Sequence, residues 1–243
     1  MKKTVIITGA SGDIGKALAE KFAKLNYNLA LCSNAHNVEY DDELKEKFKI
    51  DIKNYKMDIA DFQQVESVFS KIFADFDAVT ALVANAGISE KRKLIIDVTN
   101  EEINQLVDVN LKGSIVCARE FVKRNMDNGG KIVFVGSFVA NYGCACESVY
   151  SASKAGLVGY TKALANELGN FDFTVNIVNP GFIDTKMNNN LSTAEKEDIE
   201  DMTPLARLGE AEDVANAVAF LVEDSGNFIT GQSINVDGGY IPL

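Results

Sequence analysis

The sequence predicts an α/β protein built on a parallel β-sheet that helices cover on both faces. Seven short runs of apolar, often β-branched residues alternate along the chain with stretches that repeat apolar residues at helical spacing. Strands that are apolar throughout and alternate with helices are typical of buried parallel sheets. Of the 243 residues, 47% are hydrophobic, which is enough for the core of one large domain.

The expected elements follow one another without a break in composition. Strands are expected at residues 3–8, 29–32, 55–57, 79–84, 131–135, 175–178 and 233–236. Helical patterns are expected at about 16–25, 61–75, 101–127, 148–169 and 210–223. No linker or internal repeat is visible, so residues 1–243 are predicted to form a single domain.

One segment, residues 186–203, differs from the rest because it is polar and only weakly helical. It follows Pro180-Gly181 closely. Its composition suits a mobile substrate lid, and an ordinary solvated helix is the equal alternative.

Charge and cysteine content exclude several classes of protein. The formal net charge of −11 disfavours nonspecific binding to nucleic acids or anionic membranes. No apolar run reaches the roughly 18 residues that span a membrane. The four cysteines have neither zinc-site nor disulfide-framework spacing, and a single histidine, His36, excludes a multi-histidine metal site. We therefore expect a cytoplasmic protein with free thiols and no metal.

A glycine-rich loop, Thr8-Gly-Ala-Ser-Gly-Asp-Ile-Gly15, lies between the first strand and the first helix. Glycines let the backbone approach a pyrophosphate closely, and the N-terminus of the following helix favours the negative charge. A lone glycine motif is weak evidence, but this position at the start of a βαβ unit predicts a dinucleotide site.

The end of the second strand bears on the choice of dinucleotide. Sites for NAD usually offer a carboxylate there, and residues 33–37 contain no acid. This absence permits NADP(H), which we favour over NAD(H), and Ser33, Asn34 and His36 could donate hydrogen bonds to the 2′-phosphate. For His36, an exposed loop position is at least as good an interpretation.

Tyr150 and Lys154 are four residues apart in an expected helix, so both side chains share one face. An ammonium beside a phenol would lower the pKa of the phenol from about 10 towards neutrality. A phenol tuned in this way can give or take a proton at physiological pH.

With these motifs the chain resembles the short-chain dehydrogenase/reductase family over nearly its whole length. The matching residues occur in the family's order: Thr8-Gly and Gly15, Asp58, Asn85-Ala-Gly87, Asn110, Ser137, Tyr150, Lys154, Pro180-Gly181 and Thr185. The resemblance implies a Rossmann-type doubly wound, seven-stranded parallel sheet with helices on both faces. It also implies an NAD(P)-dependent oxidoreductase acting on CH–OH groups, and a homotetramer.

The resemblance further implies a role for individual residues. Ser137 would bind the substrate carbonyl, Tyr150 would donate its proton, Lys154 would bind the ribose hydroxyls, and Asn110 would position a water. Asp58 and residues 85–87 would line the adenine pocket, and Ile183 and Thr185 would hold the nicotinamide carboxamide. The full expected cofactor set is Gly9, Ser11, Gly12, Asp13, Ile14, Gly15, Ser33, Asn34, Asp58, Ile59, Asn85, Ala86, Gly87, Tyr150, Lys154, Pro180, Gly181, Ile183 and Thr185.

Asp13 departs from the family pattern because it occupies a position where glycine is usual. A carboxylate beside a pyrophosphate is unfavourable unless it points outward, which is the orientation that we expect.

The C-terminal third is most similar to bacterial 3-oxoacyl-[acyl-carrier-protein] reductases, through Asn179–Met187, Pro204–Gly209, Glu212–Leu221 and Ile229–Gly239. The resemblance implies NADPH-dependent reduction of a ketone to a secondary alcohol in fatty acid synthesis. Carrier protein would dock at Lys123, beside Arg119 and Arg124, whereas Asn166 stands where an arginine is expected.

Other readings stay open at the level of sequence. The substrate could be a small ketone, sugar or steroid, or a ketone-bearing protein modification. A non-catalytic dinucleotide-sensing protein is disfavoured because such proteins typically lack the tyrosine or the lysine. The basic run Lys91–Lys93 suits a solvated loop better than an anion site, and Cys144 and Cys146 suit wall packing better than redox regulation.

Overall fold

The fold is a seven-stranded parallel sheet with helices packed on both faces, as the sequence predicts. A computed structural model describes residues 2–34, 36–89, 91–188 and 191–240. The strands run in the order β3-β2-β1-β4-β5-β6-β7. They are β1 (Thr4–Thr8), β2 (Asn28–Ser33), β3 (Ile52–Lys56), β4 (Val79–Ala84), β5 (Gly130–Val135), β6 (Phe173–Pro180) and β7 (Ser233–Val236).

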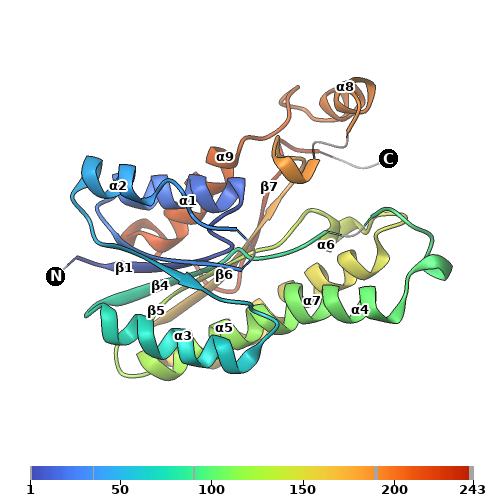
Figure 1. The fold of residues 1–243 in the computed structure, drawn as a ribbon. Helices are drawn as coiled ribbons and strands as arrows, with labels where there is room; N and C mark the ends of the chain where they lie inside the picture. The colour runs from blue at the N-terminus through green and yellow to red at the C-terminus, as the bar shows by residue number, and fades with distance from the viewer. Residues whose placement is uncertain (1, 35, 90, 189–190, 241–243) are drawn as a thin grey trace.

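Most of the helices form two layers (Figure 1). They are α1 (Asp13–Lys24), α2 (Asp41–Phe48), α3 (Phe62–Asp75), α4 (Asn100–Val107), α5 (Ser114–Asn125), α6 (Val139–Tyr142), α7 (Ser148–Leu168), α8 (Thr193–Asp201) and α9 (Ala211–Val222). Helices α1, α2 and α9 lie on one face of the sheet, and α3, α4, α5 and α7 lie on the other. Each face buries its own hydrophobic cluster, which explains why strands such as β6 are buried along their whole length.

Strand order reverses at β1, which pairs with β2 on one side and with β4 on the other. The chain leaves β1 and β4 in opposite directions, so the loops that follow these strands separate and leave a crevice. In open α/β sheets, ligands bind at such a switch point, outside the carboxyl ends of the strands. The glycine loop follows β1, and Asn85 follows β4.

The long helix expected at 101–127 is interrupted. A π-helical turn, Asp108–Gly113, separates α4 from α5. A Cβ atom on Gly113 would lie 2.7 Å from the carbonyl oxygen of Ile59, so the turn passes very close to the loop after β3. Single π-turns inside helices are frequent at functional sites, and this one carries Asn110.

Two elements escaped prediction because their apolar signal is weak. Helix α2 buries only Leu44, and α6 has just four residues. The third strand also begins at Ile52, three residues before the predicted start at residue 55.

The polar segment at 186–203 contains a short 3₁₀ turn, Lys186–Asn188, and then α8. Ser192 and Glu195 form a capping box that starts α8. Only Ile199 of α8 is buried, so the helix stands apart from the two layers (Figure 1). Positions 189–190 of the expected lid lie outside the described residues.

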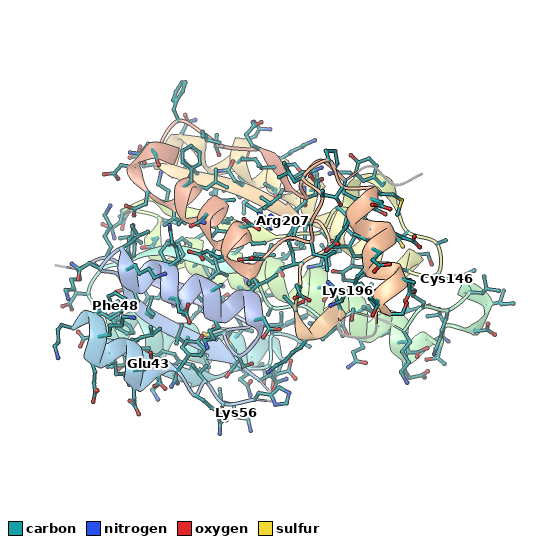
Figure 2. The ribbon with its side chains drawn as sticks, turned by 90° about the horizontal axis from the view of Figure 1, so that it is seen from above. Glu43, Phe48, Lys56, Cys146, Lys196 and Arg207 are labelled. Carbon is teal, nitrogen blue, oxygen red and sulfur yellow. The ribbon has the colours of Figure 1, made fainter. Side chains whose placement is uncertain are left out.

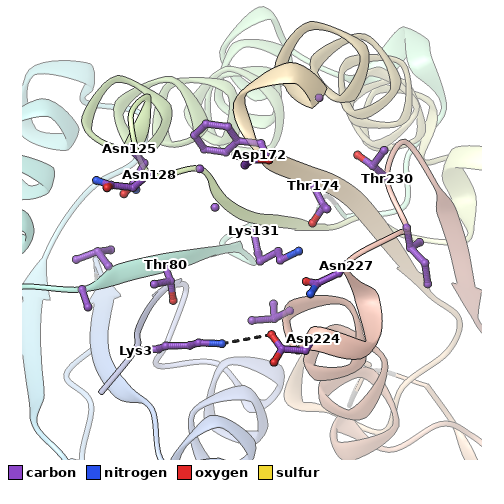
Figure 3. Close-up of a pocket in the computed structure, with 18 of the residues that line it drawn as sticks. Lys3, Thr80, Asn125, Asn128, Lys131, Asp172, Thr174, Asp224, Asn227 and Thr230 are labelled. Atoms are coloured by element: carbon purple, nitrogen blue, oxygen red, sulfur yellow. Dashed lines mark hydrogen bonds and ion pairs between the residues drawn. The ribbon is translucent and has the colours of Figure 1, made fainter. Parts of the chain in front are cut away.

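A cavity of about 1090 Å³ opens at the amino-terminal ends of the strands (Figure 3). Lys3, Thr80, Lys131 and Thr174 line it, and Lys3 pairs there with Asp224 at 3.5 Å. It lies at the end of the sheet opposite the glycine loop. None of the described helices is long and apolar enough to cross a membrane.

Candidate active site

The glycine loop is packed so tightly that only glycine fits at two positions. Gly9 has φ = 67°, and a Cβ atom there would lie 2.8 Å from the Cα atom of Ala86. A Cβ atom on Gly15 would overlap the carbonyl oxygen of Gly9. Gly12 caps α1 and has no side chain, so the N–H groups of the first turn face the crevice without a side-chain acceptor.

Thr8 ties this loop to the end of β4. Its Oγ1 accepts hydrogen bonds from the backbone N–H groups of Asn85 and Ala86, both at 3.0 Å. Nδ2 of Asn85 donates in return to the carbonyl oxygens of Thr8 and Gly9. Thr8 belongs to the motif but not to the predicted site residues. Its position at the end of the first strand, directly before Gly9, is the sequence signal that could have indicated this role.

Asp13, the residue that replaces a glycine, contacts the segment before α8. Its Oδ2 accepts a hydrogen bond of 2.7 Å from the backbone N–H of Lys186. The carboxylate therefore connects the glycine loop to the segment that follows Thr185. Nearby, Asp184 pairs with Lys196 of α8 at 3.0 Å.

Two predicted adenine-side residues occupy the ends of neighbouring strands. Ser33 ends β2, and Asp58 follows β3, where its Oδ1 accepts a hydrogen bond from the N–H of Ala60 at 2.9 Å. The backbone N–H of Asp58 donates to the side chain of Gln64, which fixes the loop that contains Ile59. Asn34 is exposed beside Ser33.

Lys154 is a buried cation with unused donors. Only 4% of the residue is exposed, and its Nζ donates to the carbonyl oxygen of Val135 at 3.0 Å. Among the described residues this is its one hydrogen bond, although an ammonium carries three N–H groups. A Cβ atom on Gly87 would lie 3.3 Å from this Nζ, so glycine keeps the approach to it open. A hydroxyl-bearing ligand such as a ribose fits this set of donors. Burial lowers the pKa of Lys154 to about 8.

The protonation of Tyr150 differs from the expectation. Burial raises its pKa to about 12, although its hydrogen bond with Ser137 opposes this shift, and Glu147 adds to the increase. Nζ of Lys154 lies 5.7 Å from the centre of the phenol ring. The predicted lowering of this pKa is therefore wrong for the protein by itself, because desolvation of the phenol is the largest effect and raises the pKa. Tyr150 keeps its proton at neutral pH.

Asn110 is fully buried in the π-turn, and its side chain forms two hydrogen bonds with the backbone of Ile88. Its Oδ1 accepts from the N–H of Ile88 at 2.8 Å, and its Nδ2 donates to the carbonyl oxygen of Ile88 at 2.9 Å. Nδ2 also lies 3.4 Å from Oγ of Ser153. The sequence predicted Asn110 but not Ser153, whose hydroxyl also donates to the carbonyl oxygen of Tyr150.

The predicted residues after β6 form the opposite wall of the crevice. The N–H of Gly181 donates to the carbonyl oxygen of Val236, and a Cβ atom on Gly181 would lie 2.7 Å from Asp237. Ile183 is buried and forms a β-bridge with Gly209, and Oγ1 of Thr185 lies 3.4 Å from the carbonyl oxygen of Ile183.

An aromatic cluster that the sequence did not reveal stands next to Tyr150. The ring centres of Phe138 and Phe182 lie 4.9 Å apart, and those of Phe138 and Tyr240 lie 5.4 Å apart. Cys144, Tyr150 and Ile199 of α8 pack against the same cluster. The three rings come from segments about 40 to 100 residues apart, so no local pattern could indicate them.

The basic residues predicted to receive a carrier protein share a buried partner. Glu120 is almost completely buried, and it pairs with Arg119 at 2.9 Å, Lys123 at 3.0 Å and Arg124 at 2.6 Å. Although burial raises the pKa of Glu120, these three hydrogen bonds lower it to about 2. The carboxylate therefore neutralises part of this basic surface.

The second basic run is also partly paired. Arg92 binds Glu147 at 3.2 Å, and Lys93 binds Glu102 at 2.5 Å. In the described part of the chain, no cluster of three or more His, Cys, Asp or Glu side chains could hold a metal ion.

Comparisons with known proteins agree with this geometry. The family model described as enoyl-(acyl carrier protein) reductase matches residues 9–241. The 3-oxoacyl-[acyl-carrier-protein] reductase FabG of Rickettsia bellii is 38% identical over 241 residues, which cover 98% of this chain and 97% of that protein. The enzyme of the same name from Escherichia coli is 35% identical over 238 residues, covering 98% and 96%.

A solved structure titled ElxO with NADP bound superposes with a TM-score of 0.90 at 30% identity and covers 99% of both chains. A second structure, a tyrosine-to-phenylalanine variant of ElxO with NADPH bound, matches equally well. With matches of this length and identity, the chain belongs to the short-chain dehydrogenase/reductase family.

Proposed function

We propose that this protein is an NADPH-dependent reductase that converts a ketone into a secondary alcohol, with a 3-oxoacyl-[acyl-carrier-protein] as its substrate. The observation that carries the proposal is the hydrogen-bonded Ser137–Tyr150 pair beside the buried Lys154. The relatives with full-length similarity bear the name of this activity.

The residues around the crevice suit a dinucleotide. Gly9–Gly15 would hold the pyrophosphate on the first turn of α1, Asp58 and Asn85–Gly87 would line the adenine pocket, and Ile183 and Thr185 would hold the nicotinamide carboxamide. When NADPH is bound, it supplies the hydride.

Tyr150 and Ser137 would act on the carbonyl oxygen. Their mutual hydrogen bond brings two hydroxyl groups to one point, where they can donate to a single oxygen. With a pKa of about 12 the phenol keeps its proton at neutral pH, as an acid for reduction requires. Phenol and hydroxyl together would neutralise the charge that develops on the substrate oxygen.

Lys154 and Asn110 would support this pair. Two N–H groups of the Lys154 ammonium remain available for ribose hydroxyls. Its positive charge would favour transfer of the proton from Tyr150, because the phenolate that forms is stabilised by a nearby cation. Asn110 fixes the backbone at Ile88, which keeps the space beside Gly87 open.

The substrate is expected to lie against the aromatic cluster, under a lid formed by residues 186–203. Phe138, Phe182 and Tyr240 offer an apolar wall for an acyl chain. Glu120 favours a second candidate, a reductase of small free ketones, because it neutralises part of the surface expected to bind an acidic carrier protein.

The test follows oxidation of NADPH and of NADH with acetoacetyl-thioesters on carrier protein and on coenzyme A, and with a panel of plain ketones. We expect the highest kcat/KM for the carrier-protein thioester with NADPH. Activity on plain ketones but on neither thioester would reject the leading substrate. Tyr150→Phe serves as the inactive control.

We also propose that the chain forms a single domain and acts in the cytoplasm. We further propose that four copies of it assemble into a homotetramer. Phe228 is fully exposed, Phe220 of α9 is half-exposed, and β7 is an edge strand of the sheet. Such a surface suits burial between copies of the chain. Light scattering after size-exclusion chromatography measures the mass, and a monomer at micromolar concentration would contradict this proposal.

A further inference from the structure

The segments predicted to contact the adenosine ribose contain no cation. Neither the glycine loop 9–15 nor residues 33–37 include lysine or arginine. A phosphate on the ribose 2′ oxygen carries nearly two negative charges, and the chain as a whole carries −11. Preference for a 2′-phosphate therefore requires a cation from elsewhere in the fold.

Lys56 lies where such a cation is needed. It is the last residue of β3, and in the parallel ladder it is the register partner of Ser33, the last residue of β2. Register partners on neighbouring parallel strands lie about 5 Å apart and project from the same face of the sheet. Ile52 of β3 and Leu31 of β2 identify that face, because both pack in the cluster under α1 and α2. A four-carbon side chain at this position can reach the space beside Ser33.

Lys56 is also uncommitted, unlike the other lysines of this region. It is exposed, and no described acidic group lies within ion-pair distance of it. Lys53, on the opposite face of β3, pairs with Asp75 at 3.0 Å, and Lys16 of α1 pairs with Glu20 at 3.8 Å.

Asp41 of α2, which contacts β3 through Asn54, is occupied as well. Asp41 accepts hydrogen bonds from Asn54, at 2.7 Å, and from Lys45, at 3.2 Å. In Figure 2 Lys56 lies at the margin of the molecule. The ammonium is thus free to meet an anion from solvent.

We propose that Lys56 is the cationic contact for the 2′-phosphate of the adenosine ribose and sets the preference for NADPH over NADH. The inference deepens the proposed function and rests on it. Ser33 and Asn34 would add neutral hydrogen bonds to the same phosphate. Lys56 would supply the charge, which their side chains lack.

Two nucleotides that differ only in this phosphate isolate the contact. The dissociation constants of 2′,5′-ADP and 5′-AMP are measured by calorimetry for the wild-type protein and for Lys56→Met. We expect Lys56→Met to raise the dissociation constant of 2′,5′-ADP by about tenfold or more. The dissociation constant of 5′-AMP should change by less than twofold. Lys56→Arg should bind 2′,5′-ADP nearly as the wild type does. The salt dependence of 2′,5′-ADP binding should become shallower in Lys56→Met.

Lys53→Met is the matched control, since it removes a cation from the same strand on the opposite face. Unchanged 2′,5′-ADP affinity in Lys56→Met would overturn the assignment, and so would an equal loss for 5′-AMP. A loss confined to Lys16→Met would transfer the role to Lys16. If the wild-type protein bound neither nucleotide, the proposed function would fail together with this inference.

Discussion

The cofactor side and the substrate side of the crevice are built in different ways. On the cofactor side, Thr8 and the glycine loop are fixed by backbone contacts, and a single Cβ atom on Gly9 or Gly15 would collide with neighbouring backbone. On the substrate side, Phe138, Phe182 and Tyr240 meet through their side chains, and α8 buries a single residue against them.

This difference teaches where the chain tolerates change. Backbone contacts at Gly9 and Gly15 permit only glycine, whereas side-chain packing on the substrate side permits several residue types. Substitutions at Gly9 and Gly15 should therefore weaken cofactor binding strongly, and those near α8 should change the Michaelis constant for the substrate. Tyr150 and Lys154 stand between the two sides.

The largest effect is expected from Tyr150→Phe. Loss of the phenolic proton donor should lower kcat by about a thousandfold or more, because general acid catalysis and the orientation of the carbonyl are lost together. NADPH binding, measured by fluorescence titration, should change by less than threefold. Equal losses of binding and turnover would contradict the separation of the two sides.

Gly15→Ala tests the cofactor side directly. The added Cβ would overlap the carbonyl oxygen of Gly9, so the loop must shift. We expect NADPH affinity to fall by about a hundredfold and the free energy of unfolding to fall by about 1–3 kcal/mol. Gly159→Ala is the control, because nothing lies within 4 Å of a Cβ atom there. Wild-type affinity in Gly15→Ala would show that the loop is not held as tightly as these contacts indicate.

The pKa of about 8 for Lys154 predicts the pH dependence of the reaction. Its ammonium is mostly present at pH 7, half lost near pH 8, and about nine-tenths lost at pH 9. With NADPH saturating, kcat/KM for the ketone should therefore fall about tenfold per unit above pH 8. Tyr150, with a pKa of about 12, adds no loss in this range. A profile that stays flat to pH 10 would show that the charge on Lys154 is not required.

Lys154→Met should stabilise the protein while it removes activity. The folded-state pKa lies below the unfolded value of 10.5, so burying the ammonium costs about 3 kcal/mol at neutral pH. Loss of the hydrogen bond to Val135 offsets about 1 kcal/mol of the gain. Urea denaturation should show a more stable variant at pH 7.

The sign of this effect can be checked with pH. Between pH 8 and 10.5 the unfolded chain binds more protons than the folded one, so this lysine's contribution to stability rises with pH. The advantage of Lys154→Met should therefore shrink over that window. A variant that is less stable than the wild type at pH 7 would contradict the prediction.

The contrast between the two sides also explains what sequence could predict. The glycine loop, Tyr150 and Lys154 are recognisable because local spacing indicates their chemistry, and Ser137 follows from the family resemblance. Most strands are recognisable as short apolar runs, but β3 has a largely polar sequence and was predicted only from residue 55. Helix α2 could not be predicted from a pattern with one buried residue.

Long-range effects escaped prediction for a physical reason. The increase in the pKa of Tyr150 comes from burial by the fold, which no pair of residues in the sequence can reveal. Glu120 likewise looks like an ordinary helix-surface acid in sequence, and only the packing of α5 shows it to be buried among three cations.

The smallest effect is expected where the two sides join, at Asp13. Its carboxylate accepts the backbone N–H of Lys186, so it connects the glycine loop to the base of the proposed lid. Asp13→Ala should speed hydrogen exchange at the Lys186 amide about tenfold and raise KM for the ketone about threefold, because one hydrogen bond is worth about 1 kcal/mol. NADPH affinity should hold or improve, since a carboxylate near the pyrophosphate is lost. Asp13→Asn retains an acceptor for the Lys186 amide and should restore its protection. Equal exchange rates at Lys186 in the wild type, Asp13→Ala and Asp13→Asn would contradict this prediction. The proposed lid would then be held by its aromatic contacts and not by Asp13.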